Sequence, residues 1–413
     1  MTKFLKVISP SAVLKILEGF PPLEAETIGL EAATGRVLAA STVSGEDIPA
    51  FPRATMDGFA VRARDVYGAS EIIPALLEVV GKVEMGEAAR QPLTPGQAIV
   101  IPTGGMLPPG ADAVVMVEHT QPLDDRTIEV TRPAAPGDNV LQVGEDLRSG
   151  AEVLPAGQRL RPQDVGLLAA LGIMSVAVHR RPRVAVISTG DEVVSAGTAQ
   201  LPLGKTRDIN SYSIAGQLRQ IGAITTLCGI VEDSLPQLTA TCRQALADHD
   251  VVLLSGGSSV GARDYTIQVL ESLPGAEILF HGIAVRPGKP TILARVGQKV
   301  FWGLPGQPVS ALTIFTAFVK PLLERLEGER QKSVLQEATR IAMLSASLPS
   351  VHGRSDYASV VLEERDGRLW ATPLFGKSAM ISLLSRADGY VIVPEHSEGL
   401  DQGTEVRIHL FSR

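Results

Sequence analysis

The stretch VVLLSGGSSVGARDYT, residues 251–266, decides the fold of this chain. Its first four residues are apolar without alternation, which is typical of a strand buried on both faces of a parallel sheet. A loop of three glycines and three serines follows at residues 255–261, and we expect a helix to begin near Asp264. A buried strand, a glycine-rich loop and a helix N-terminus together favour an anion site, above all for phosphate.

The same loop has two other interpretations. Residues 257–261, GSSVG, match the GxSxG pattern of serine hydrolases, which would make Ser259 a nucleophile. That enzyme class requires an acidic residue and then a histidine later in the chain, and His281 follows too early for this order. The remaining interpretation is a tight turn without a binding role.

Composition narrows the possible functions. The 413 residues predict two to four domains, at about 150 residues per domain. A net charge of −7 and an aromatic content of 4% argue against a nucleic-acid partner. Cys228 and Cys242 form no CxxC motif, so no cysteine scaffold is expected. No apolar run reaches about 18 residues and the N-terminus lacks a signal-peptide core, so we expect a cytoplasmic protein without a membrane partner.

Changes of pattern along the chain predict four domains. Helical patterns at 1–44, including a helix over 30–38, and at 144–180 predict one split helical domain. Residues 45–143 combine clustered proline and glycine with short valine-rich and isoleucine-rich runs, typical of an inserted small β domain. Residues 181–328 alternate strand and helix, which indicates a doubly wound α/β domain. Residues 329–413 predict a β-barrel-like domain.

A rim of charged side chains is expected at the carboxyl ends of the α/β strands, where ligands bind in such folds. It comprises Asp191, Glu192, Asp233, Asp264 and Lys289. The carboxylates would repel one another without a cation among them. A hard divalent ion such as Mg²⁺, shared with substrate phosphates, therefore fits this rim.

Further motifs stand in order along nearly the whole chain: PRATMDGFAV, IPTGG with PPGADAVV, GEDLRSG, ISTGDEVV, RDINSYSIAGQLRQIGA, VEDS, LLSGGSSVGARDYT, VRPGKP, GLPGQPVSA and SRADGYVIVPE. This combination resembles the molybdopterin molybdenumtransferase family of molybdenum-cofactor biosynthesis. The resemblance implies a homodimer of four-domain subunits whose α/β domain binds adenylylated molybdopterin. It also implies that molybdate is inserted with Mg²⁺-dependent release of AMP, which yields molybdenum cofactor.

The resemblance assigns candidate catalytic residues to this sequence. They are Asp57, Thr103, Asp146, Glu192, Asp233 and Asp264. Glu192, Asp233 and Asp264 are also the expected Mg²⁺ ligands. Because Asp57 and Thr103 belong to the β insertion, we expect a partner subunit to supply them across the dimer cleft.

The resemblance also assigns a substrate-binding set. Its members are Ser255, Gly256, Gly257, Ser259, Gly261, Arg286, Lys289, Pro305, Gly306, Pro308, Ser310 and Arg354. Residues 255–261 are expected to hold phosphate through backbone amides, Lys289 to meet phosphate or molybdate, and Arg354 to help hold the oxyanion. Two positions depart from the family. Arg286 stands where lysine is common, which changes the hydrogen-bond geometry, and Gln307 stands where asparagine is usual, which lengthens an amide near the pterin end.

Other functions stay open at this point. A molybdopterin adenylyltransferase would share the α/β domain, but it would be expected as a lone small domain. Some relatives of the family anchor other proteins through the C-terminal domain, so a binding scaffold without turnover is a second alternative. A tungstate-inserting relative is a third. Possible protein partners are the molybdopterin adenylyltransferase and apo-molybdoenzymes.

Overall fold

The structure is a computed structural model that describes residues 7–256, 260–330 and 338–411, and for residues 260–264 the backbone alone. Its contacts divide the chain into two compact units. Unit 1 comprises Met1–Ala40, Gly157–Val165 and Ser175–Arg413, and unit 2 comprises Ser41–Ala156 and Gly166–Met174. Unit 2 is therefore inserted into the sequence of unit 1, while the four domain boundaries given above stay a prediction.

Unit 1 is built on a six-stranded sheet with the order β16-β13-β17-β21-β20-β18. Its strands are β13 (Arg183–Thr189), β16 (Ile224–Val231), β17 (Val251–Ser255), β18 (Ala276–His281), β20 (Ile292–Val296) and β21 (Lys299–Leu304). The first four strands in the spatial order are parallel, and β20 runs antiparallel to both of its neighbours. The sheet is therefore mixed, and the sequence pattern did not reveal β18.

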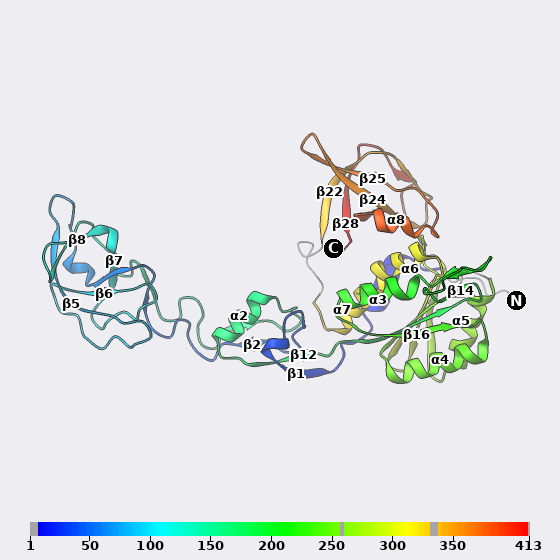
Figure 1. Ribbon diagram of the computed structural model, residues 1–413, viewed down its shortest axis with the longest axis horizontal. Helices are drawn as coiled ribbons and strands as arrows, with labels where there is room; N and C mark the ends of the chain where they lie inside the picture. Colours follow the sequence, from blue (N-terminus) through cyan, green and yellow to red (C-terminus); the bar gives the residue numbers. More distant parts are fainter. Residues whose placement is uncertain (1–6, 257–259, 331–337, 412–413) are drawn as a thin grey trace. The chain divides into compact units, whose positions relative to one another are not determined.

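Helices cover both faces of this sheet (Figure 1). Val251 and Leu253 of β17 share one core with α1 (Pro10–Leu17), α3 (Asn210–Gln220), α6 (Pro308–Ile314) and α7 (Lys320–Leu326). Val252 and Leu254 share the other core with α4 (Leu235–Asp248) and α5 (Val260–Ser272). Because neighbouring side chains of a strand point to opposite faces, both must be apolar here. This confirms the doubly wound fold expected from residues 251–254.

The start of α5 differs from the prediction. The helix begins at Val260, not near Asp264. The Gly-Ser loop therefore ends earlier than its composition indicated, and Gly261 lies inside the first helical turn.

The predicted helix over residues 30–38 is wrong. Only Leu30–Ala32 forms a short 3-10 turn. Before it, β1 (Ala25–Gly29) pairs antiparallel with β12 (Ser175–His179), a ribbon that the helical interpretation of residues 1–44 and 144–180 missed. Gly35 has a φ of 78°, a left-handed conformation that interrupts a helix. The helix predicted before Gly172 does form, as α2 (Pro162–Ala170).

The C-terminal part of unit 1 is a closed barrel. Its strands are β22 (Thr339–Leu344), β24 (Ser355–Arg365), β25 (Arg368–Pro373), β26 (Gly389–Val393) and β28 (Glu405–Leu410). They follow the ring β24-β25-β22-β28-β26, and β26 pairs with β24 again. The seam between β22 and β25 has two residue pairs, Met343 with Trp370 and Leu344 with Ala371. The barrel expected from the sequence is confirmed.

The barrel is attached to the α/β part by backbone pairing. The short strand β19 (Val285–Arg286) pairs in parallel with the first residues of β24. The Val309 N–H at the start of α6 donates to the Ser378 carbonyl at 3.1 Å. Residues of the barrel therefore lie beside the loops that follow the strands of the α/β sheet.

Unit 2 carries a second six-stranded sheet, in the order β7-β4-β6-β5-β9-β8. Its strands are β4 (Gly58–Val61), β5 (Ala75–Lys82), β6 (Gln97–Ile101), β7 (Ala113–Met116), β8 (Thr120–Pro122) and β9 (Thr127–Val130). Neighbouring residues of one strand, such as Ala60 and Val61, are buried in two different cores. The predicted β character of residues 45–143 is therefore confirmed, with apolar side chains on both faces.

An ion-pair network joins the β1–β12 ribbon to the α/β sheet within unit 1. Asp250, which precedes β17, accepts two hydrogen bonds from the Arg180 guanidinium at 2.7 and 2.8 Å and one from the Arg183 N–H at 2.8 Å. Burial would raise the pKa of the Asp250 carboxyl, but the hydrogen bonds from Arg180 and Arg183 outweigh it and lower the pKa.

We expect unit 1 to lose stability when Asp250 is protonated. A carboxyl whose pKa is lowered by folding stabilises the folded state. This stabilisation is fully present above the pKa of the unfolded chain, about 3.9, and is lost as the pH falls through the pKa of the folded state. Asp250→Asn should cost about 2 kcal/mol at pH 7 and less below pH 4. Thermal unfolding at several pH values measures this. Asp248→Asn is the matched control, because it removes an exposed carboxylate at a helix end that accepts a hydrogen bond from Gln244. If Asp248→Asn lowered the free energy of unfolding as much as Asp250→Asn, the stabilising role assigned to Asp250 would be contradicted.

Candidate functional site

A buried polar network lies where β13 ends and α3 begins. The Ser188 hydroxyl donates to Asp208 Oδ1 at 3.0 Å and lies 2.8 Å from the Ser211 hydroxyl. The Ser211 N–H also donates to Asp208 Oδ1, at 3.2 Å. All three side chains are buried. Sequence reasoning missed them, although an Asp close before a helix, as Asp208 in RDINS, is a usual helix-start signal.

Asn210 joins three segments at the carboxyl ends of the strands. Its Nδ2 donates to the Ser255 hydroxyl at 2.7 Å and to the Gly306 carbonyl at 2.8 Å. Asn210 and Ser255 are buried. The start of α3, the end of β17 and the loop before α6 are therefore held together by one amide, which sequence reasoning also missed. Ser255 and Gly306, two predicted substrate-binding residues, are brought to one place by it.

The acidic rim lies along the ends of β13 and β16. Asp233 Oδ1 accepts a hydrogen bond from the Thr189 hydroxyl at 2.7 Å, and the Asp233 N–H donates to Asp191 Oδ1 at 3.2 Å. Gly190 has a φ of 140°, and a β-carbon there would stand 2.9 Å from Glu192 Oε2. Glu192 therefore folds back over Gly190, and glycine leaves room for it. Asp191, Asp233 and Glu192 share this rim, as predicted from the strand ends.

The side chains in the described part of the chain form no group of three or more His, Cys, Asp or Glu residues that could hold a metal. Asp264, the third predicted Mg²⁺ ligand, has its side chain outside that part. Carboxylate oxygens are the donors that a hard cation prefers, and one oxygen of Asp233 accepts a hydrogen bond from the Thr189 hydroxyl. The metal assignment stays a prediction.

A wide cleft of about 1030 Å³ adjoins the ends of β17 and β21. Its lining includes many of the predicted substrate-binding residues: Gly256, Arg286, Lys289, Pro305, Gly306, Ser310 and Arg354. Arg354 Nε lies 2.9 Å and Arg286 Nη1 lies 3.5 Å from the carboxylate of the buried Asp356. Asp356 thus holds two guanidinium groups of the cleft wall, while Lys289 and Lys377 add further positive charge. The excess of cations makes the cleft suited to an anion.

The backbone at Lys289 is firmly held. Gly288 has a φ of 114°, and a β-carbon there would stand 2.6 Å from the Ile314 side chain. The Thr291 hydroxyl donates to the Gly288 carbonyl at 2.7 Å. The Lys289 carbonyl accepts from the N–H groups of Ile283 and Thr291 at 3.0 and 2.9 Å. The exposed ammonium of Lys289 is therefore presented to the cleft from a fixed turn.

The loop before α6 contacts the barrel. The Gln307 side-chain oxygen accepts a hydrogen bond from the Ser378 hydroxyl. Pro308 begins α6 at its first position, and the side chain of Gln307 makes no capping hydrogen bond to the helix. The amide that departs from the family pattern is therefore used to fasten the cleft wall, and its effect on substrate stays a prediction.

Several predicted residues belong to the Gly-Ser loop between β17 and α5. Gly257 and Ser259 lie outside the described residues, and so do the side chains at 260–264, Asp264 among them. Gly261 is described as backbone within α5. The phosphate-binding role of the loop and the serine-hydrolase alternative through Ser259 therefore stay untested predictions.

In unit 2 the structure brings Asp57 and Thr103 together. Asp57 Oδ1 accepts hydrogen bonds from the Thr103 N–H at 2.6 Å and from its hydroxyl at 2.8 Å. These bonds, the backbone one first, lower the pKa of the exposed Asp57 carboxyl. Asp146 is also exposed, and its N–H donates to the Ile48 carbonyl at 3.1 Å. The described residues include no hydrogen bond between the Asp146 side chain and Asp57 or Thr103.

We expect Thr103→Val to raise the pKa of Asp57 while leaving it below the ordinary value. The substitution removes the hydroxyl donor but keeps the N–H donor, which contributes more. A titration of the Asp57 carboxylate carbon by NMR measures the shift. Thr120→Val is the matched control, because that hydroxyl donates to the Val117 carbonyl instead. An unchanged Asp57 pKa in Thr103→Val would contradict the side-chain hydrogen bond.

Comparisons with known proteins cover almost the whole chain. Three family descriptions match it in succession: "MoeA N-terminal region (domain I and II)" at residues 8–172, "Probable molybdopterin binding domain" at 185–325, and "MoeA C-terminal region (domain IV)" at 342–411.

Individual relatives match this chain over most of its length and of their own. The molybdopterin molybdenumtransferase of Bacillus subtilis is 34% identical over 94% of this chain and 90% of its own. The protein of the same name from Haemophilus influenzae is 32% identical over 96% and 97%. The molybdopterin biosynthesis moeA protein of Pyrococcus horikoshii OT3 is 33% identical in sequence. Its crystal structure superimposes with a TM-score of 0.84 and covers 98% of this chain and 100% of its own.

Proposed function

Because the chain belongs to the MoeA family of molybdopterin molybdenumtransferases, transferases that insert molybdenum during molybdenum-cofactor biosynthesis, we propose that it joins molybdate to adenylylated molybdopterin and releases AMP. The observation that carries this proposal is the cationic cleft beside the ends of β17 and β21. Both proposed substrates are anions, one through its phosphoanhydride and the other as an oxyanion. A wall with Arg286, Lys289 and Arg354 complements both.

Lys289 and Arg354 are proposed to bind one of the two anions each. Lys289 follows a fixed turn and is assigned to the phosphoanhydride, where it stabilises negative charge that develops on the leaving phosphate. Arg354 is held by Asp356 and is assigned to the oxyanion. Holding molybdate beside the dithiolene sulfurs makes the transfer effectively intramolecular.

Mg²⁺ is proposed to be held by Glu192, Asp233 and Asp264. When bound there, a divalent cation would neutralise charge on the substrate phosphates. Thr189 donates a hydrogen bond to one oxygen of Asp233, and we assign the other oxygen to the cation. Asp233→Asn is expected to raise the Mg²⁺ concentration needed for AMP release, and an unchanged requirement would refute the assignment.

The chain is further proposed to act as a cytoplasmic homodimer in which Asp57 and Thr103 complete the partner's site. A mixed dimer tests this. One subunit carries Asp57→Asn and the other Lys289→Met. If the site combines residues of both subunits, one of its two sites is intact and about half of the activity returns. If each site is built from one subunit, both sites are damaged and the mixed dimer stays inactive.

The decisive experiment is AMP release by the purified full chain from adenylylated molybdopterin, with and without Mg²⁺ and molybdate. Release that needs both ions, and that yields a cofactor able to activate an apo-molybdoenzyme, supports the proposal. Tight binding without release favours a scaffold, which would bind the adenylyltransferase or apo-molybdoenzymes through the barrel. Release that needs tungstate favours the tungstate-inserting alternative. None of the helices in the described ranges is long and apolar enough to span a bilayer.

A further inference from the structure

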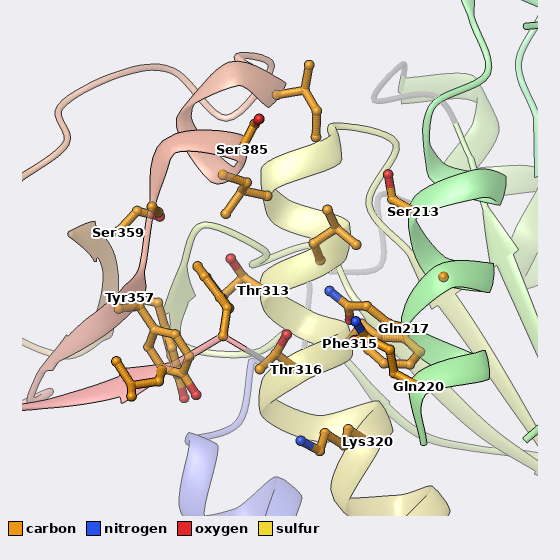
Figure 2. A pocket seen from close by; sticks show the side chains of 18 of the residues that line it. Ser213, Gln217, Gln220, Thr313, Phe315, Thr316, Lys320, Tyr357, Ser359 and Ser385 are labelled. Carbon is orange, nitrogen blue, oxygen red and sulfur yellow. The ribbon is translucent and has the colours of Figure 1, made fainter. Parts of the chain in front are cut away.

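Unit 1 contains a second cavity, of about 590 Å³, between α3, the helical run α6–α7 and the barrel (Figure 2). Its lining shares Tyr357 and Ser359 with the cationic cleft, and its other lining residues are different. The two cavities therefore adjoin each other but are separate. The volume lies within the range of about 300–1000 Å³ that is usual for small-molecule sites.

One wall of this cavity is aromatic. The rings of Tyr357 and Tyr390 lie 5.7 Å apart at 42°, and those of Tyr390 and Phe411 lie 5.7 Å apart at 41°. All three line the cavity from the barrel. His409 stacks on one face of Tyr390, with ring centroids 5.1 Å apart at 13°, so the group offers its edges and remaining faces to another planar ring.

The opposite wall is polar. Ser213, Gln217 and Gln220 follow one another at four-residue and three-residue steps on α3, so they share one helical face. Neither of the two glutamine amides has a hydrogen-bond partner among the residues that the structure describes. Each offers a donor and an acceptor, the pair of functions that recognises the edge of a heterocycle.

The charged groups that line the cavity balance formally, but they differ in their hydrogen bonds. Two charged side chains line it, Lys320 at the start of α7 and Asp388 before β26. The Asp388 carboxylate is engaged, because it accepts a hydrogen bond from the Leu362 N–H at 2.8 Å. Lys320 has neither an ion-pair nor a hydrogen-bond partner within the described ranges. A partly buried ammonium in such a place favours an anionic group on the ligand.

We propose that this cavity binds a planar heteroaromatic molecule that carries one anionic group. The ring lies against Tyr357 and Tyr390, the amides of Gln217 and Gln220 bind its edge, and Lys320 binds the anion. This site shares Tyr357 with the lining of the proposed molybdenum-transfer cleft but does not use Lys289.

Fluorescence titration of the full-length protein tests the proposal, with pterin-6-carboxylate as the probe and uncharged pterin as its matched comparison. The charged probe should bind at least about tenfold more tightly than the neutral one. Lys320→Met should remove that difference, Lys320→Arg should keep it, and Gln217→Leu should weaken both probes. Lys289→Met, which changes the adjoining cleft, should leave probe binding unchanged.

Several results would overturn the proposal. They are equal affinity for the two probes, unchanged binding in Lys320→Met and Gln217→Leu, and loss of binding in Lys289→Met, which would place the probe in the cleft. Absence of binding at millimolar probe would do so as well. Thermal unfolding of each variant shows whether it is folded, and the retained binding of Lys320→Arg separates lost charge from lost structure. AMP release by the unmodified chain is measured in parallel, so a failure of the proposed function is seen separately.

Discussion

Replacing Lys289 with methionine is expected to lower kcat/KM for AMP release by about a thousandfold. Its ammonium stands on a turn fixed by Gly288 and Thr291, so the positive charge does not have to be reorganised when negative charge develops on the leaving phosphate. Removing one such preorganised group typically costs a factor of about 10² to 10³ in rate. Steady-state assay of AMP release with Mg²⁺ and molybdate measures the effect.

Two further variants make that result interpretable. Lys289→Arg keeps the charge but changes its shape, so a partial loss is expected. Lys15→Met removes an exposed ammonium on α1, outside the lining of the cleft, and should leave the rate unchanged. If Lys289→Met retained full activity, the assignment of the cleft to the phosphoanhydride would be refuted. If Lys15→Met lost as much, the effect would come from overall charge.

Asn210→Leu is expected to combine the largest loss of stability with a loss of activity. The substitution removes a buried amide that binds the Ser255 hydroxyl and the Gly306 carbonyl, and it leaves both acceptors without that donor. Buried groups left in this state cost about 1–3 kcal/mol each. Because Gly306 belongs to the cleft wall, a shift of its loop should also lower kcat/KM by about a hundredfold.

Denaturant unfolding and the AMP assay measure these two effects together. Gln244→Leu is the matched control, because its amide donates to Asp248 on an exposed helix end and its loss should cost little. Ser211→Ala, which removes a single hydroxyl contact next to Asn210, should fall between the two. A free energy of unfolding in Asn210→Leu that equals that of the unmodified chain would show that Asn210 does not hold these segments together.

The sequence predicts the α/β sheet well because burial on two faces leaves a direct trace. Residues 251–254 are all apolar, and the structure divides them between two cores. The ribbon of β1 and β12 leaves no such trace. Residues 25–29, AETIG, are exposed or partly buried, and their pairing with residues 175–179 is non-local. A helical pattern in the neighbouring residues therefore dominated the prediction.

Some candidate residues could be proposed from the sequence because their type alone indicates a chemistry. Carboxylates at strand ends and a lysine in a glycine-proline turn are such cases, and the structure places Asp233 at the strand-end rim and Lys289 in the cleft wall. Asn210 and Asp208 were not predicted, because their role depends on which loops the fold brings within hydrogen-bond distance. The same holds for Gln307, whose partner Ser378 lies in the barrel.

The closed ring of barrel strands affects how the barrel unfolds locally. A sheet with ends can lose its outermost strand first, as β16 can at the margin of the α/β sheet. The ring has no outermost strand, so any strand that leaves must break two ladders at once. Opening should therefore begin at the weakest seam, the two residue pairs of β22 with β25. Hydrogen exchange should find the amides of this seam less protected than those of β24 and β26, which are paired over five residues.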